Sequence, residues 1–232
     1  MRRSSCSCCC SCLPTVAAAG AALAAYVFVI RPWHLKWGAS ADEARQQMPG
    51  DDLVPSPLLE TTRAISIDAP AERVWQWLLQ LGTGRGGWYS YDFLENMMGL
   101  GVHSARTIVP ELQSLAVGDV IPAAPPPYIG FRVQTIDPPK VLATATAFDM
   151  IAGLMLEPGG PLVGRRLDAS WTFVLAPLGE ARCRLIARLR GAYAPGLVSS
   201  LFVRCLLEPM HFLMERRMLL GIKQRAEAAA TG

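Results

Sequence analysis

The chain has 232 residues, of which 51% are hydrophobic and 18% are charged, so it can form a sizeable core and is not globally disordered. Residues 1–40 hold four basic side chains and no acid, whereas the rest of the chain holds 18 basic and 19 acidic side chains. A nucleic-acid-binding domain normally concentrates positive charge on its folded part, so this balance argues against nucleic acid as a partner.

The N-terminal end is rich in cysteine, with five of the seven cysteines in residues 1–12. Cys6, Cys9 and Cys12 have the internal spacing of zinc ligands, but no second pair completes a tetrahedral site. We therefore predict no metal site and no cofactor, and we interpret residues 1–12 as a cysteine-rich tail. Lipidation of its thiols is the alternative interpretation.

Residues 13–30, LPTVAAAGAALAAYVFVI, contain no charge. As a helix they would extend about 27 Å, enough to cross a bilayer core, and Trp33 and Trp37 follow as candidate interfacial rings. This pattern predicts a single-pass N-terminal transmembrane anchor. A cleaved signal peptide is the alternative. Basic residues lie on both sides of the run, so the membrane side of the folded part is undetermined. Residues 31–59 are polar and proline-rich, which predicts a juxtamembrane linker to a domain at residues 60–229.

The domain begins with a predicted strand and two short helices. TTRAISIDAP (61–70) alternates apolar and polar residues, as a half-buried strand does. AERVWQWLLQL (71–81) has apolar residues at helical spacing and ends at a run of glycines. YSYDFLENMMG (89–99) predicts a second helix, with an apolar side formed by Phe93, Leu94, Met97 and Met98.

Antiparallel strands and a long helix are predicted next. LAVGDVIP (115–122) indicates a turn into a strand, and FRVQTIDPPKVLATATAF (131–148) a strand, turn and strand. DASWTFVLAPLGEARCRLIARLRGAY (168–193) is a hairpin whose arms alternate, with Trp171 and Leu185 on apolar faces and a row of arginines opposite. A helical stretch follows from about residue 197 to 229, with a kink or restart at Pro209. The order predicts an α+β fold in which a curved antiparallel sheet wraps a long C-terminal helix.

These segments resemble the START-like helix-grip superfamily, and more closely its bacterial SRPBCC group of polyketide cyclase/dehydrase and lipid-transport type. The resemblance covers residues 60–228 and depends on three segments, which are TRAISIDAPAERVWQWLLQLGTGRGGWYSYDFLEN, VGDVI and MERRMLLGIKQRAE. The glycine-aromatic-acidic segment is typical of a membrane-attached subgroup of undefined activity. The resemblance implies a hydrophobic cavity between the sheet and the terminal helix. A shared fold does not by itself establish a shared function.

The glycines of LGTGRGG (81–87) do not form a phosphate-binding loop. Such a loop needs a strand before the glycines and a helix after them, and here a helix precedes. We interpret the glycines as a hinge between the two short helices.

Acid–base residues follow the glycines. Asp92 and Glu95 share a helix face, and His103 comes shortly after, so these three are weak catalytic candidates. A solvated helix face is the alternative for the two acids. His211, on the terminal helix, is interpreted as a packed or capping histidine.

The candidate ligand-binding residues are aromatic and aliphatic side chains near the glycines, on the hairpin and on the terminal helix: Trp88, Tyr89, Tyr91, Trp171, Phe173, Leu185, Leu189, Phe202 and Phe212. Together they favour a membrane-tethered domain that binds a hydrophobic small molecule or lipid and is not an enzyme. A cyclase or dehydratase that uses the acid–base residues is one alternative, and a ligand-free interaction or stress module is another. The sequence does not determine whether the domain has a protein partner.

Overall fold

The computed structural model describes residues 18, 20–22, 24–97, 99–125, 127, 129–157 and 159–228. The cysteine-rich tail (1–12) and seven residues of the uncharged run (13–17, 19 and 23) lie outside these residues.

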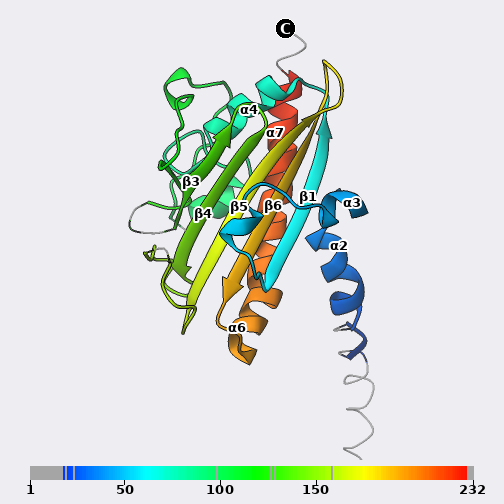
Figure 1. Cartoon of the computed structure of the whole chain (residues 1–232), viewed down its shortest axis with the longest axis vertical. Helices are drawn as coiled ribbons and strands as arrows, with labels where there is room; N and C mark the ends of the chain where they lie inside the picture. Colours follow the sequence, from blue (N-terminus) through cyan, green and yellow to red (C-terminus); the bar gives the residue numbers. More distant parts are fainter. Residues whose placement is uncertain are drawn as a thin grey trace, which may run out of the picture.

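A six-stranded antiparallel sheet is the centre of the fold (Figure 1), with strand order β1-β6-β5-β4-β3-β2. The strands are β1 (Leu59–Ile67), β2 (Val120–Pro122), β3 (Gly130–Asp137), β4 (Val141–Asp149), β5 (Arg166–Pro177) and β6 (Cys183–Tyr193). Strands adjacent in sequence are adjacent in the sheet except β1, which pairs with the last strand, β6.

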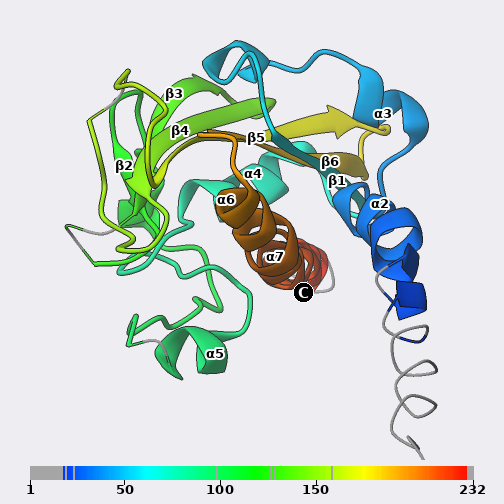
Figure 2. The same ribbon diagram turned by 90° about the horizontal axis from the view of Figure 1, so that it is seen from below.

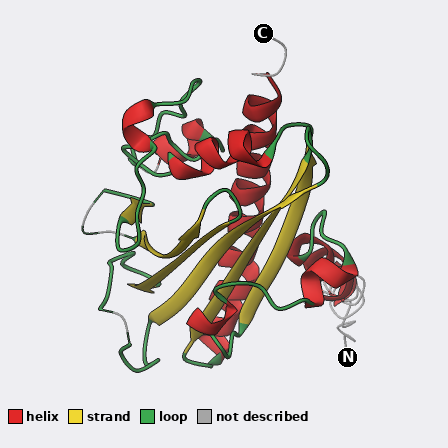
Figure 3. Ribbon diagram, turned by 45° about the horizontal axis from the view of Figure 1, so that its top comes forward, coloured by secondary structure: helices red, strands yellow, loops and turns green. Residues whose placement is uncertain are grey.

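One long helical segment crosses one face of this sheet (Figure 3). It consists of α6 (Leu197–Phe202), a π-helical turn η4 (Val203–Leu207) and α7 (Glu208–Ala228). The π turn lies directly before Pro209, which has no N–H to donate to the preceding turn, so the predicted irregularity occurs there. The shorter helices α4 (Ala71–Leu79) and α5 (Asp92–Met97) connect β1 to the rest of the sheet. The fold is a helix grip.

Strand alternation determines the two faces of the sheet, as the sequence pattern predicted. Trp171 on β5 is paired with Leu189 on β6 and with Thr144 on β4, so these side chains share the inner face that α7 covers. The arginines of β6 alternate with them and point to the outer face. The inner face and α7 enclose the main core.

The outer face is covered by the chain before β1, which we call the strap (residues 36–58). It contains α3 (Ala41–Arg45) and a single 3₁₀ turn, η2 (Asp51–Leu53). Figure 2 shows the strap on one side of the sheet and α7 on the other. Met48 of the strap packs against Ala64 and Ile186 from the outer face.

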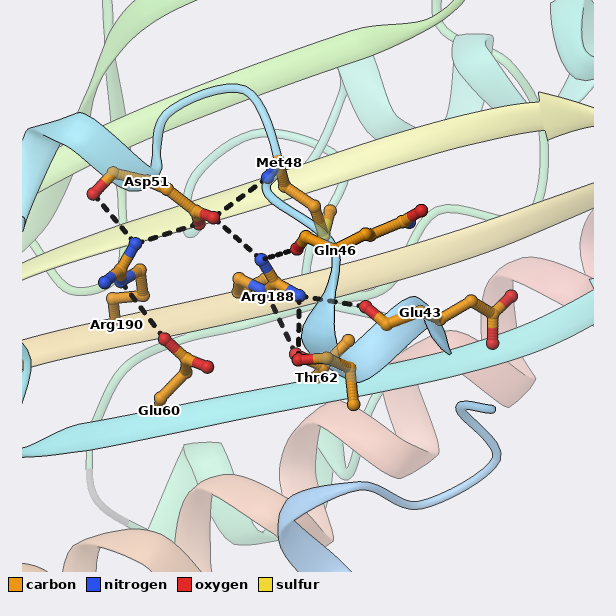
Figure 4. Close-up of polar contacts among 9 residues, drawn as sticks. Glu43, Gln46, Met48, Asp51, Glu60, Thr62, Arg188 and Arg190 are labelled. Carbon is orange, nitrogen blue, oxygen red and sulfur yellow. Dashed lines mark hydrogen bonds and ion pairs between the residues drawn. The ribbon is translucent and has the colours of Figure 1, made fainter. Parts of the chain in front are cut away.

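Three arginines of β6 hold the strap. Arg184 pairs with Glu43 at 2.7 Å, and the contacts of Arg188 and Arg190 are shown in Figure 4. Arg188 donates to the Asp51 carboxylate at 2.8 Å, to the Gln46 carbonyl at 2.9 Å and to the Glu43 carbonyl at 2.9 Å. Arg190 reaches the other carboxylate oxygen of Asp51 at 3.3 Å. The arginine row is therefore neutralised by the chain itself and is not left as a solvated face.

The prediction of an N-terminal transmembrane helix in front of the domain is corrected by the structure. Among the described residues, the helix with the length and apolar composition to cross a membrane is Leu197–Ala228, after the sheet. The described end of the uncharged run, Tyr26–Ile30, continues into α2 (Arg31–Leu35), which packs against α7 through an ion pair of 2.7 Å between Arg31 and Glu208. The sequence argument used the length of the uncharged run and treated the terminal helix only as a core helix.

Candidate functional site

The glycine loop between α4 and α5 determines where the following aromatic side chains point. Gly82 and Gly87 pair through backbone hydrogen bonds of 3.1 and 3.0 Å, which close a tight turn. A Cβ at Gly86 would lie 2.6 Å from the Gln80 carbonyl oxygen, and Gly87 has a φ of +78° beside Ser104. Both positions require glycine for backbone packing, so the loop forms a tightly packed turn between α4 and α5.

Tyr89 fixes this loop to the C-terminal helix. Its φ is 55°, and its carbonyl oxygen occupies the place that a Cβ at Gly221 would need. The ring is buried against Trp77, and the guanidinium of Arg225 lies over it at 4.6 Å. Burial raises the pKa of the Tyr89 hydroxyl, which donates to the Trp77 carbonyl at 3.3 Å. Tyr89 therefore has a structural role behind the site.

A cavity of about 190 Å³ lies between the sheet, α7 and the segment after the glycine loop. Its apolar lining consists of Trp88, Leu100, Ala123, Phe131, Trp171, Met214 and Met218, and its polar lining of Ser90, Glu95, His211 and Glu215. Most of the wall is apolar, and the few polar groups converge from two sides.

Aromatic rings form the wall on the side of the sheet. Trp88 and Trp171 stack with their ring centroids 5.7 Å apart and an interplanar angle of 24°. Phe131 contacts Trp171 at 5.3 Å, and the Trp88 indole N–H donates to Thr83. The parallel tryptophans give the cavity flat surfaces.

A buried ionic network forms the base of the cavity. Arg63 on β1 and Glu215 on α7 are both fully buried and form an ion pair. The second carboxylate oxygen of Glu215 accepts from the Trp171 indole N–H at 2.7 Å, and Arg63 also donates to the His34 carbonyl at 2.8 Å. These bonds satisfy both oxygens of Glu215 and lock the Trp171 ring in place.

His211 presents an N–H group to the cavity. Its Nδ1 lies 2.9 Å from Nη1 of Arg63, and because a guanidinium can only donate, Nδ1 must be the acceptor and Nε2 carries the proton. Among the described residues Nε2 has no hydrogen-bond partner, since the nearest Glu215 oxygen is 3.9 Å away. Burial lowers the pKa of His211 to about 4, so the ring is neutral at pH 7.

Glu95 contributes a carboxyl group from α5. Its side chain is 3% exposed, Oε1 accepts from the Ser90 hydroxyl, and Oε2 has no partner among the described residues. Burial raises the pKa of this carboxyl, and the nearby Asp92 raises it further. α5 is thus turned opposite to the prediction, because Phe93 and Met97 of its expected apolar side are exposed and its acid is buried.

The other acid–base candidates lie away from the cavity. Asp92 accepts from the Ser104 backbone N–H at 2.8 Å and from its hydroxyl, and so stabilises the loop after α5. His103 is exposed in that loop, and Tyr91 is 37% exposed. None of the three lines the cavity.

Of the nine ligand-binding candidates, the structure brings Trp88 and Trp171 into the cavity. Phe173, Leu185 and Leu189 are buried in the core beneath it. Phe202 lines a separate hollow near α6, and Phe212 packs against Trp33 and His34.

Sequence reasoning missed Phe131, Met214 and the polar pair His211 and Glu215. An available signal was the four-residue spacing from His211 to Glu215, which places both on one helix face in an otherwise apolar stretch. Among the described residues, no group of three or more His, Cys, Asp or Glu side chains could hold a metal ion.

A second hollow of about 300 Å³ lies on the outer face of the sheet, beside the strap. Its Asp168 is already paired with Arg166 at 2.7 Å, and Arg132 donates to the Gly118 carbonyl at 2.9 Å. The buried Thr146 hydroxyl in this hollow has no hydrogen-bond partner among the described residues. The part of its lining that the structure describes has no aromatic side chain, whereas the inner cavity combines aromatic walls with convergent polar groups, so the inner cavity is the stronger candidate site.

No protein-family model matches the sequence, and no curated protein matches it. Solved structures with a similar fold include a hypothetical protein from Helicobacter pylori, with 8% identity and a TM-score of 0.43 over 78% of this chain and 95% of that chain. A protein from Nitrosospira multiformis has 10% identity and a TM-score of 0.41 over 75% and 100% of the two chains. An aromatase/cyclase from Streptomyces sp. R1128 has 14% identity and a TM-score of 0.33 over 73% and 93%. With TM-scores below 0.5 these likenesses carry no argument about this chain, and the functional argument depends on the cavity.

Proposed function

We propose that this chain binds a planar, largely apolar small molecule that carries one hydroxyl or carbonyl oxygen, in the cavity between the sheet and α7. The observation that carries the proposal is a pair of buried polar groups in an apolar cavity, His211 Nε2–H and Glu95 Oε2, which have no hydrogen-bond partner in the described part of the chain. Buried polar groups are almost always hydrogen-bonded, and leaving one unpaired costs about 1–3 kcal/mol. A ligand oxygen would satisfy them.

The size and shape of the cavity limit the ligand. A dry apolar cavity of about 150 Å³ is sufficient to bind benzene, and this one has about 190 Å³. The stacked Trp88 and Trp171 favour a flat ring over a bulky sterol-like body. An aromatic or polyketide-like ring system, or the ring-bearing end of a larger molecule, fits these limits.

The cavity supports binding better than acid–base catalysis. A cyclase or dehydratase needs a general base that faces the substrate. The contact with Arg63 places the proton of His211 on the nitrogen that faces the cavity, and a pKa of about 4 makes the ring a weak base. Glu95, whose pKa is raised, can serve as an acid, but the described residues of the cavity offer no general base to act with it.

We also infer that the chain is a START-like helix-grip protein. The inference is supported by the order of strand, two short helices, five further antiparallel strands and a long terminal helix over the sheet.

Calorimetric titration with 2-naphthol and naphthalene tests the proposed function, because these two probes differ by one hydroxyl. We expect both to bind, with 2-naphthol favoured roughly three- to tenfold by one hydrogen bond. His211→Phe should remove this preference and retain naphthalene binding. His103→Phe, in an exposed loop, is the matched control and should change neither affinity.

Two results would reject this function. One is that neither probe binds to the wild-type chain. The other is that the preference for 2-naphthol survives both His211→Phe and Glu95→Gln.

A further inference from the structure

The first half of the C-terminal helical segment exposes an unusually apolar surface. The most apolar 18 residues of Leu197–Ala228 have a mean hydropathy of 1.4, and 17% of them are buried. Leu197 and Val198 are 77% and 82% exposed, and Leu206, Met210 and Leu213 continue the surface at spacings of four and three residues. Such a stripe is one face of a helix. Contiguous exposed apolar surface of this kind marks an interaction site.

Two neighbouring segments extend this surface. The N-terminal helical turns are bound to the same helix through Arg31 and Glu208, and they expose Phe28, Val29 and Trp33. On the other side, the exposed Ile151 lines a hollow together with Leu197 and Val198. We call the combined surface, built from residues 27–33, Ile151 and 197–213, the apolar face.

The exposed charges on the two helical segments of the apolar face are basic, and Asp149 beside Ile151 is paired with Arg165 at 3.0 Å. The acids within residues 197–217 are Glu208 and Glu215, and both are 1% exposed and paired with arginines. Arg204 is exposed on the same segment, and Arg216 and Arg217 lie half-buried one turn beyond the apolar stripe. Residues 26–38 contain two basic residues and no acid. Exposed apolar and aromatic side chains bordered by basic ones match the interface of an anionic bilayer.

The geometry points to a lipid bilayer surface as the occupant of the apolar face: we propose that α6 and the first turns of α7 lie on the membrane. The helix does not need to cross the bilayer, because its second half, including Met218, Leu219 and Ile222, is buried in the core of the domain. Arg204 can then extend to the headgroups while its neighbours enter the acyl boundary. Tyr26, which follows the uncharged residues 13–25 in the sequence, donates its hydroxyl to the Arg204 carbonyl and so lies beside this face. The proposal is independent of the cavity ligand.

Position-specific fluorescence on the full chain tests this proposal. Cys183 is buried, and the remaining cysteines are replaced by serine, including the exposed Cys205. An environment-sensitive thiol dye is then attached at Leu201→Cys or Leu213→Cys. The matched control is Leu178→Cys, an exposed leucine in the β5–β6 turn, which lies at the opposite end of the sheet from α6.

With vesicles of phosphatidylcholine and phosphatidylglycerol, we expect blue-shifted and several-fold brighter emission at positions 201 and 213, together with quenching by acyl-chain nitroxide lipids. Position 178 should not change. Arg204→Glu should weaken the response on phosphatidylglycerol vesicles more than on pure phosphatidylcholine.

Two outcomes would overturn the membrane proposal. In one, the protein binds vesicles but the dyes at positions 201 and 213 keep the emission spectrum that they have in water. In the other, the same spectral change appears without lipid as the protein concentration rises, which would make a second copy of the chain the occupant.

Discussion

At the scale of single residues, Arg63 is the central polar group of the molecule. It is fully buried, and it contacts Glu215, His211 and the His34 carbonyl, so it connects the strand, the helix and the N-terminal segment. The same contacts orient His211 toward the cavity. The ionic network is therefore both a structural device and the support of the proposed binding site.

Removing the charge of Glu215 should leave Arg63 buried without an anionic partner. We expect Glu215→Gln to lower the free energy of unfolding by about 3–5 kcal/mol, as measured by urea denaturation. Glu227→Gln on the same helix removes a partly exposed i,i+4 pair with Lys223 and should cost less than about 1 kcal/mol. Equal losses in the two variants would contradict the importance assigned to the buried pair.

Acid should destabilise the fold through His34 and His211. Burial lowers the pKa of each to about 4 from an ordinary value of 6.5. As pH falls below 6.5 the unfolded chain takes up these protons first, so stability is lost between pH 6.5 and about pH 4 and is not lost further below that for these groups. Each histidine should contribute on the order of 2–3 kcal/mol.

Urea denaturation at a series of pH values measures this loss. His211→Phe should reduce the slope between pH 6.5 and 4, whereas His103→Phe, in the exposed loop, should leave it unchanged. A slope that does not respond to His34→Phe or His211→Phe would refute the assignment.

At the scale of elements, the contact between the glycine loop and α7 determines how closely the helix approaches. Gly221 lies against the Tyr89 carbonyl with no room for a side chain. In an exposed helix, replacing glycine by alanine normally stabilises by up to about 1 kcal/mol. At Gly221 the same replacement should lower stability, because the added methyl group has no space.

We expect Gly221→Ala to lower the free energy of unfolding by about 1–3 kcal/mol, because α7 or Tyr89 must shift to accommodate the methyl group. Gln224→Ala, an exposed position on the same helix, is the control and should be neutral or slightly stabilising. Thermal denaturation of the two variants provides the comparison. A Gly221→Ala variant that is more stable than the wild type would contradict this prediction, because it would mean that Tyr89 and its loop can move at little energetic cost.

Elements formed by local sequence patterns could be predicted from the sequence, whereas features that depend on contacts between distant residues could not. Alternation along β5 and β6 is a local pattern, and it placed Trp171, Phe173, Leu185 and Leu189 correctly on the inner face. The orientation of α5 was wrong, because the burial of Glu95 depends on Ser90 and on the cavity wall, not on the helix's own apolar residues.

The cavity itself could be predicted only as a place between sheet and helix. Its polar groups come from the segment around α5 and from α7, more than 100 residues apart, and no local pattern shows that Glu95 and His211 line one space. The acidic partners of the arginines on β6 could not be predicted from the sequence for the same reason. The segment that carries Glu43 and Asp51 has the composition of a linker, and its contacts exist only once the sheet is formed.

At the scale of the whole molecule, the strap and α7 enclose the sheet from opposite sides. The Asp51 carboxylate joins the strap to two arginines and also accepts from the Met48 N–H at 2.9 Å. Asp51→Asn should weaken these charged hydrogen bonds and lower stability by on the order of 2 kcal/mol. Asp52→Asn, at the exposed neighbouring position, should change stability little.

Hydrogen–deuterium exchange of residues 40–58 locates the effect of Asp51→Asn. Faster exchange in the strap with unchanged exchange in β5 is the expected pattern, because the inner face keeps its own core. Exchange that rises equally throughout the sheet would mean that the strap and the sheet unfold as one unit.

The charged contacts that close the molecule all join early residues to late ones. Arg188 lies 137 residues from Asp51, Arg63 lies 152 from Glu215, and Arg31 lies 177 from Glu208. Until β6 and α7 have left the ribosome, the strap, β1 and Arg63 have nothing to pair with. Contacts of such long sequence separation slow folding, because distant parts of the chain must meet before any of them is stabilised. The chain should therefore gain its protection against proteases late and in a single step, after synthesis of the C-terminal helix.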